Sequence, residues 1–403
     1  FLFFIRILAL RMKRKIFPVI LLGSFLALTL VFFFCNRIKG DVINGSNIVE
    51  IISVPVDYDN ILPSDSLISD FKFVPLETNE NCLISHISGL AFLNNRFYIL
   101  DRNAQQILVF DTSGHFINKV NSIGRGPGEY AEIRDFKIDH EGNIYILSFN
   151  KILVFSARGS FLKQIDFNFL ENETDAFNPI QFALAGDEGF YFWRGSFGFK
   201  KEYQDNYYAL YRTNKRLKII NKYFPLKGPI FGGLNMFYGE EGNYSMQALI
   251  GNDTIYKIGK NGLSAGYFID FGGKKLPEEF IRSKGSESRF YSEVLTTTDY
   301  SMNIDNIFET SRFVYFLFAN GMHWRNVLYS KNSKKALAGT VNSMVSSPVL
   351  CTYNNSFVSS IVKVKSAGDI PAGSETERKI KEYLKSVGEM DNPVLFIYSL
   401  KDF

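Results

Sequence analysis

Two copies of one strand pattern, at residues 96–120 and 143–165, constrain the fold of this chain more than any other feature. Each copy holds an aromatic-rich strand, a short polar break, a second apolar strand, a glycine-containing turn and a third strand that opens on phenylalanine. The equivalent residues Tyr98 and Tyr145 lie 47 positions apart. Because a β-propeller blade packs three or four short strands into about 45 residues, this period predicts an all-β propeller.

Weaker copies of the pattern continue to the end of the chain. They are found at residues 189–193 with 207–211, 253–258 with the Asn261-Gly262 turn, 313–318 with 327–329, 356–364, and 394–400. Counting the candidates for first strands predicts five or six blades. We expect residues 48–75, which include the strand-like stretch 48–52, to close the ring against strands from the C-terminus. Closure removes the exposed edges that an open sheet would leave.

The composition agrees with this fold class. The chain has 403 residues, of which 46% are hydrophobic and 16% are aromatic, including 40 Phe and 21 Tyr. This supply of apolar side chains fills a large core, and aromatic residues suit the pleated surfaces of strands. We therefore assign residues 41–403 to a single propeller domain and residues 1–40 to a leader.

The leader carries the basic charge of the chain. Residues 1–40 contain seven Lys and Arg and no acidic residue. Removing those seven from the 45 basic residues leaves 38 against 41 Asp and Glu, so the remainder is close to −3. The net charge of +4 thus describes the leader, and nucleic-acid binding is not expected of the domain.

The leader has the pattern of an export signal. A basic stretch follows Met12, which we take as the true start, and residues 17–34 form an uncharged apolar run. Cys35 comes directly after this run and resembles the acylated cysteine of a bacterial lipoprotein, although Phe34 stands where such sites have a small residue. We expect a lipid anchor at Cys35, with an uncleaved single-span anchor as the alternative. Both place the domain outside the cytoplasm, facing the periplasm or the outer membrane.

One helix interrupts the strand pattern near the C-terminus. Residues 374–377, Ser-Glu-Thr-Glu, form a capping box, and Ile380, Leu384 and Val387 recur at helical spacing before Gly388. We expect a short insertion packed on the last blade. A partner-binding helix is the alternative.

The glycine-rich loop at residues 124–130, Gly-Arg-Gly-Pro-Gly-Glu-Tyr, is the best candidate for a binding site. A nucleotide-binding loop opens a helix, whereas residues 136–139 read as a strand, so the glycines indicate a tight crossing between blades. Arg125, Glu129 and Tyr130 are the candidate ligand contacts, because loops on rigid scaffolds often carry binding. The alternative is a salt bridge and a packed ring that hold the crossing.

The repeat and this loop together resemble the NHL-type repeat and a largely uncharacterised family of six-bladed propeller lipoproteins from Bacteroides-type bacteria. The residues that carry the resemblance are 98–101, Asn103, 107–111, Gly114, the loop 124–130, residues 71–78 and residues 392–395. Membership implies export, a lipid anchor and a six-bladed ring. It implies no catalytic mechanism.

No catalytic or metal-binding pattern accompanies the repeats. The four histidines (His86, His115, His140 and His323) are scattered, and there is no zinc motif or nucleophile elbow. We predict no catalytic residue, no metal and no cofactor. Cys82 and Cys351 are expected to be separate buried thiols, with a disulfide as the alternative.

These observations leave two hypotheses open. The first is a binding or scaffold propeller at the cell envelope, with a peptide, protein or glycan as ligand. The second is an envelope lyase or hydrolase with an active site at the axis of the ring. Trp193 and Trp324 could stack on a sugar, although packing is the commoner role of such rings.

Overall fold

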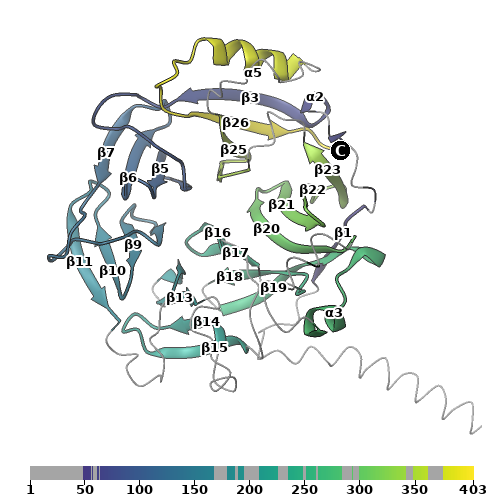
Figure 1. The fold of residues 1–403 in the computed structure, drawn as a ribbon, viewed down its shortest axis with the longest axis horizontal. Coiled ribbons are helices and arrows are strands. Elements are labelled where there is room, and N and C mark those ends of the chain that lie inside the picture. Colours follow the sequence, from purple (N-terminus) through teal and green to yellow (C-terminus); the bar gives the residue numbers. More distant parts are fainter. Residues whose placement is uncertain are drawn as a thin grey trace, which may run out of the picture. The chain divides into compact units, whose positions relative to one another are not determined.

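The second of two units in the chain, Asn44–Phe403, contains a closed ring of six sheets, whose strands are antiparallel except for one added parallel strand in each of two sheets (Figure 1). The computed structural model describes residues 49–55, 57, 61–62, 64–167, 179–186, 189–194, 208–225, 235–247, 251–259, 262–283, 293, 299–341, 348–361 and 375–403. The predicted leader, with Cys35, lies outside these ranges. The six sheets confirm the predicted all-β class and the predicted number of blades.

Each of the first three blades is a four-stranded sheet. Blade 1 has β4 (Gly89–Leu93), β5 (Arg96–Asp101), β6 (Gln106–Asp111) and β7 (Phe116–Val120). Blade 2 has β8 (Asp135–Ile138), β9 (Ile144–Ser148), β10 (Lys151–Phe155) and β11 (Phe161–Asp166). Blade 3 has β12 (Gln181–Leu184), β13 (Phe190–Trp193), β14 (Tyr208–Thr213) and β15 (Ile219–Pro225).

The other three blades combine C-terminal strands with strands from the start of the domain. Blade 4 has β16 (Phe237–Glu240), β17 (Asn243–Gln247), β18 (Thr254–Gly259), β19 (Gly262–Asp270) and β1 (Glu50–Ser53). Blade 5 has β20 (Ser301–Glu309), β21 (Phe313–Asn320), β22 (His323–Ser330), β23 (Lys335–Val341) and β2 (Ile61–Leu62). Blade 6 has β24 (Cys351–Tyr353), β25 (Ser356–Ile361), β26 (Val394–Leu400) and β3 (Ile68–Pro75).

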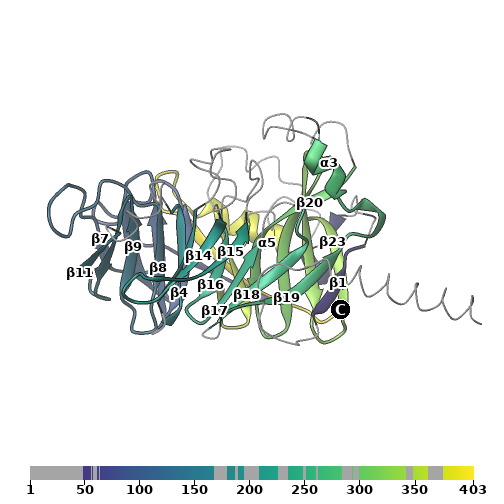
Figure 2. The same cartoon turned by 90° about the horizontal axis from the view of Figure 1, so that it is seen from below.

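The ring is closed by the N-terminal part of the domain, as the sequence predicts. β3 pairs antiparallel with β26, from Val394 opposite Pro75 to Leu400 opposite Ile68. The first strands of the blades contact one another in cyclic order around the axis, from β4 through β8, β12, β16 and β20 to β24 and back to β4. Figure 2 shows the same sheets side by side when the ring is seen from its edge.

The predicted position of the stretch 48–52 is wrong in one respect. Its strand β1 does not join the C-terminal strands but pairs in parallel with the outer strand β19 of blade 4, from Glu50 opposite Tyr267 to Ser53 opposite Asp270. β2 then adds in parallel to β23 of blade 5. The extended chain before β3 thus covers two outer edges, and Ile52 is fully buried there.

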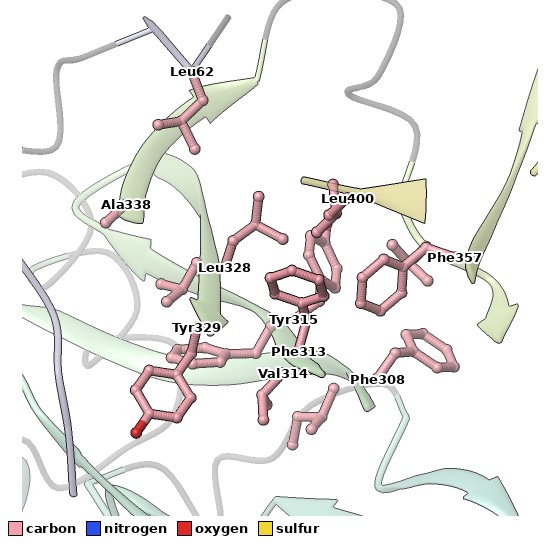
Figure 3. Packing of buried hydrophobic residues seen from close by; sticks show 14 of the residues in the cluster. Leu62, Phe308, Phe313, Val314, Tyr315, Leu328, Tyr329, Ala338, Phe357 and Leu400 are labelled. Atoms are coloured by element: carbon pink, nitrogen blue, oxygen red, sulfur yellow. The ribbon is translucent and has the colours of Figure 1, made fainter. Parts of the chain in front are cut away.

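The core lies between neighbouring blades, where the faces of their sheets meet. The largest cluster contains Phe313, Val314 and Tyr315 of blade 5 and Phe357 of blade 6 (Figure 3). The rings of Tyr315 and Phe357 are 5.9 Å apart, within the range of favourable aromatic pairs. Burying such faces is the main stabilising term of the ring.

Steric crowding explains why each clear repeat has a glycine in the turn before its outer strand. Gly114 and Gly159, in the turns before the outer strands of blades 1 and 2, have φ angles of +90° and +80°. A Cβ at Gly114 would lie 2.0 Å from the carbonyl oxygen of Pro75, at the end of the preceding blade's outer strand. A Cβ at Gly159 would meet Lys119 O at 3.1 Å in the same way. Leu217 occupies this position in blade 3 at φ +62°, which explains why that repeat is faint in the sequence.

The predicted C-terminal helix is confirmed as α5 (Glu375–Lys385), with Ile380 and Leu384 buried. The capping residue that the sequence indicates, Ser374, lies outside the described residues. Instead, the carboxylate of Asp65, in α2 (Ser64–Leu67), accepts the backbone N–H groups of Glu375 and Thr376 at 2.7 and 2.9 Å. Two further short helices, η4 (Gly272–Lys274) and α3 (Glu278–Ser283), follow β19.

Candidate functional site

The loop that crosses from β7 to β8, residues 121–134, is held in place by Tyr130. The Tyr130 ring is fully buried between blades 1 and 2. Its hydroxyl lies 2.9 Å from the acceptor Gln105 O and 3.3 Å from Val120 O, and accepts the N–H of Ser122 at 3.2 Å. Burial raises the pKa of Tyr130 to about 12. This geometry makes Tyr130 a residue that positions the loop.

Glu129 folds back over the glycines of the loop. Its carboxylate accepts the N–H of Gly126 at 2.8 Å, and a Cβ at Gly124 would lie 2.0 Å from the Glu129 Oε2 atom. Lys151 of β10 donates to the carbonyl oxygen of Glu129 at 2.8 Å. The glycines therefore make room for Glu129, and these hydrogen bonds hold the loop, as expected for a tight crossing.

Arg125 is the exposed member of the predicted trio. In the part of the chain that the structure describes, its guanidinium has no hydrogen-bond or ion-pair partner, so the salt bridge considered from the sequence does not form with Glu129. Such a guanidinium presents five N–H donors in a planar fork that matches a carboxylate or a phosphate. Arg125 is thus available to a ligand, whereas Tyr130 and Glu129 shape the loop that carries it.

Two residues that the sequence did not single out, Phe149 and Arg102, lie beside Arg134 at the end of this loop. Phe149, in the turn between β9 and β10, is 50% exposed, and the guanidinium carbon of Arg134 lies 4.3 Å from its ring centre. Arg102, in the corresponding turn of blade 1, is exposed and donates to Arg134 O at 2.8 Å. An aromatic residue inside the polar break 148–150 is the signal that could have pointed to Phe149.

Polar side chains of the inner strands bridge neighbouring blades. Asp135 of β8 accepts the N–H of Phe182 in blade 3 at 3.0 Å, and its other oxygen lies 3.0 Å from Lys137 Nζ. Gln181 of β12 accepts the N–H of Met236 at 2.8 Å. These groups hold the first strands together around the axis, and their hydrogen bonds offset the cost of their burial.

A second polar cluster joins blades 4 and 5. Lys257 of β18 donates to Ser245 Oγ at 2.8 Å and forms an ion pair with Glu309, which also accepts from Tyr267 at 2.7 Å and from Lys331 at 2.5 Å. Burial, followed by the charge of Lys331, lowers the pKa of Lys257 to about 7. The cluster is a polar contact between blades.

The four histidines remain apart in the fold. All are exposed; His115 lies 3.2 Å from Asp111, and His140 lies 3.2 Å from Glu241. The hydrogen bond to Glu241, followed by the charge of this carboxylate, raises the pKa of His140. Within the described ranges no three His, Cys, Asp or Glu side chains gather in an arrangement that could hold a metal ion.

Both described cysteines and one of the two tryptophans are buried. Cys82 and Cys351 are free, buried thiols of one hydrophobic cluster, in agreement with the predicted separate thiols. Trp193 is buried in blade 3, whereas Trp324 of β22 is 46% exposed. No helix among the described residues is long and apolar enough to cross a bilayer.

The ring of six blades with N-terminal closure defines the class of this protein as a six-bladed β-propeller. The particular family is that described as a domain of unknown function, DUF4934, whose model matches residues 49–399; the chain belongs to this family.

The solved structures to which the chain is similar include three from Bacteroides. The protein BF0058 of Bacteroides fragilis NCTC 9343, which carries the name of an exported protein, is 21% identical with a TM-score of 0.71, covering 87% of this chain and 100% of that one. A DUF4221 family member from Bacteroides vulgatus ATCC 8482 is 11% identical with a TM-score of 0.49, covering 83% and 97%. The extracellular domain of BT4673 from B. thetaiotaomicron is 13% identical with a TM-score of 0.33, covering 73% and 31%. None of the curated proteins matches.

Proposed function

We propose that this chain is an exported, membrane-anchored propeller that binds a protein, peptide or glycan at the cell envelope. The basic and apolar leader supports export, as does the exported name of the similar Bacteroides fragilis protein. Cys35 is the proposed site of lipid attachment, and an uncleaved span in residues 17–34 is the alternative anchor.

The observation that carries the binding role is the state of Arg125. Among the described residues this long, exposed side chain has no hydrogen-bond or ion-pair partner, and hydrogen bonds of Tyr130 and Lys151 hold its loop in place. The exposed ring of Phe149, stacked on Arg134, lies on the neighbouring turn. Arginine and aromatic side chains on a rigid surface are the residues that dominate binding energy in protein interfaces.

The described inner strands favour binding over the alternative of a lyase or hydrolase. Asp135 and Gln181, which lie near the axis, already form hydrogen bonds with the backbone of neighbouring blades. A catalytic group must instead be free to reach the reacting atoms of a substrate.

The binding role is tested with the full-length chain in detergent on peptide and glycan arrays and by quantitative cross-linking in intact envelopes. We expect Arg125→Glu and Phe149→Ala each to lower the captured signal about tenfold or more, as hot-spot residues do. Arg158→Glu, an exposed arginine on another turn of blade 2, is the matched control and should leave the signal unchanged. Equal capture by Arg125→Glu and the control would refute this site.

The anchor is tested by incorporation of labelled palmitate into cells that express the chain. Cys35→Ala should abolish the label, while Cys82→Ala, a change at a buried thiol, should retain it. Label that persists in Cys35→Ala would reject the lipid anchor at this residue.

A further inference from the structure

The outer edges of the blades are covered unequally. Among the described residues, the outer strands β19 and β23 of blades 4 and 5 each carry an added parallel strand, β1 or β2. The outer strands β7, β11 and β15 of blades 1, 2 and 3 are the last members of their sheets. Figure 1 shows these three strands on the outside of the ring. An uncovered edge strand offers a row of backbone groups to another chain.

β11 is the most exposed of these edges. Its residues 161–164 are all exposed, with Phe161 at 43% and Leu162 at 53%. Ile117 of β7 and Ile220 of β15, which stand one position into their strands like Leu162, are also exposed. Proteins normally protect such edges with charged or bulged residues. β11 has Lys163 and a register shift beside Phe155, yet its Phe161 and Leu162 side chains stay exposed, which marks a place for a partner strand.

The backbone of β11 is oriented for strand addition. Phe167 donates its N–H to Asn150 O at 2.9 Å, so its backbone points toward β10. Because antiparallel residues alternate between pointing inward and outward, the N–H and C=O groups of Gln164 and Asp166 point away from the sheet. A partner strand can pair with them without disturbing blade 2.

The surroundings of this edge are basic. Lys163 lies on β11, and Arg216 and Lys218 are exposed on the turn between β14 and β15. Leu217 of this turn belongs to the same hydrophobic cluster as Phe167, which follows β11, so the basic turn and the end of β11 share one core. Asp166, the acidic residue of the strand, accepts a hydrogen bond from Gln164 at 2.7 Å. The charge therefore suits an acidic partner.

The chain itself shows how such a partner binds. In blade 4, β1 lies on β19 with Ile52 buried, while Glu50 accepts from Lys334 Nζ and Tyr329 Oη at 2.5 Å each. An extended segment with apolar and acidic residues thus supplies a fifth strand whose carboxylate meets a lysine of the neighbouring blade. The edge of β11, whose end shares a core with the turn that carries Arg216 and Lys218 of the neighbouring blade, repeats the main features of that arrangement.

We propose that the outer edge of β11 binds an extended acidic polypeptide segment of a partner protein as a fifth strand of blade 2. Main-chain pairing with Gln164 and Asp166 gives affinity, and contacts to Leu162 and Lys163 give preference for apolar and acidic side chains. The proposal uses none of the residues Arg125, Glu129 and Tyr130, although Gly128 of their loop adjoins the Phe161 ring. An anionic membrane would suit the charge but would leave the edge backbone unpaired, which favours the polypeptide.

The test uses the full-length chain in detergent and a fluorescent peptide of alternating valine and glutamate, with alternating valine and lysine as the control peptide. We expect saturable binding of the glutamate peptide and slower amide hydrogen exchange in residues 161–167. Lys163→Glu should weaken binding about fivefold or more. Lys335→Glu, on the outer strand of blade 5 that β2 already covers, should bind like the unchanged chain.

The backbone part of the proposal is tested by Gln164→Pro, which removes an outward N–H and keeps the bonds to β10. It should abolish binding, whereas Gln164→Thr should retain it, and hydrogen exchange in β9 and β10 verifies that blade 2 stays folded. Two results would overturn the proposal. One is binding that survives Gln164→Pro in the folded protein. The other is binding to phosphatidylglycerol vesicles, sensitive to Lys163→Glu, without any binding of the peptide.

Discussion

The contact between Gly114 and the carbonyl oxygen of Pro75 predicts that Gly114→Ala strongly destabilises the ring. The contact joins blade 1 to β3, the strand that closes the ring. The change adds one methyl group at φ +90°, 2.0 Å from that oxygen. Since the nearest atom belongs to backbone, neither side can relax by rotating a side chain.

The size of the effect follows from two contributions. A left-handed conformation costs about 1–2 kcal/mol for a residue with a Cβ. Overpacking against backbone costs about 1–3 kcal/mol more. With an unfolding entropy of about 2.1 cal/mol/K per residue, the 360 residues of the unit 44–403 convert 1 kcal/mol into about 1.3 °C of Tm. A total of about 2–5 kcal/mol therefore lowers Tm by about 3–7 °C.

Two other glycines separate these contributions. Gly242 has φ +82° and no atom within 4 Å of an added Cβ, so Gly242→Ala isolates the conformational cost and should lower Tm by about 1–3 °C. Gly273 has open space and no left-handed φ, so Gly273→Ala should change Tm by no more than about 1 °C. Calorimetry of the three variants measures the order. A Gly114→Ala variant no less stable than Gly242→Ala would refute the steric argument.

Three further changes are predicted from single contacts. Asp65→Ala removes the cap of α5, so amide exchange at Glu375 and Thr376 should accelerate with a loss of about 1 kcal/mol, and unchanged exchange would disprove the capping role. Tyr130→Phe leaves Gln105 O without its 2.9 Å donor and should cost about 1–3 kcal/mol in denaturant unfolding. Burial raises the pKa of Tyr130, and burial with the charge of Asp139 raises that of Tyr145, both to about 12. Because the folded state holds these protons above pH 10, where the unfolded chain loses them, stability should be complete below pH 10 and fall toward pH 12. Absorbance at 295 nm during alkaline unfolding measures this, and early ionisation of both rings would contradict it.

The sequence predicted which loop carries the candidate site, but not which of its side chains is exposed and which is buried. The glycines at 124–128 indicate a tight crossing, and the structure places Arg125, Glu129 and Tyr130 on it. Only the fold shows that Tyr130 is buried beneath the loop and that Arg125 is exposed. The neighbouring Phe149 belongs to a different turn, and proximity between turns of two blades leaves no trace in local spacing.

The sequence by itself determined the elements whose signals are local. The strands of blades 1 and 2, the turn glycines and the helix α5 follow from periodicity and turn chemistry within a few residues, so the pattern predicts them. The tertiary structure alone decided the pairing of β1 with β19, the Asp65 cap on α5 and the position of β11 as the last described strand of its sheet. These features join residues separated by more than 200 positions, or depend on which edges remain free after the ring closes. The local spacing of residues along the chain predicts neither the long-range pairs nor the free edges.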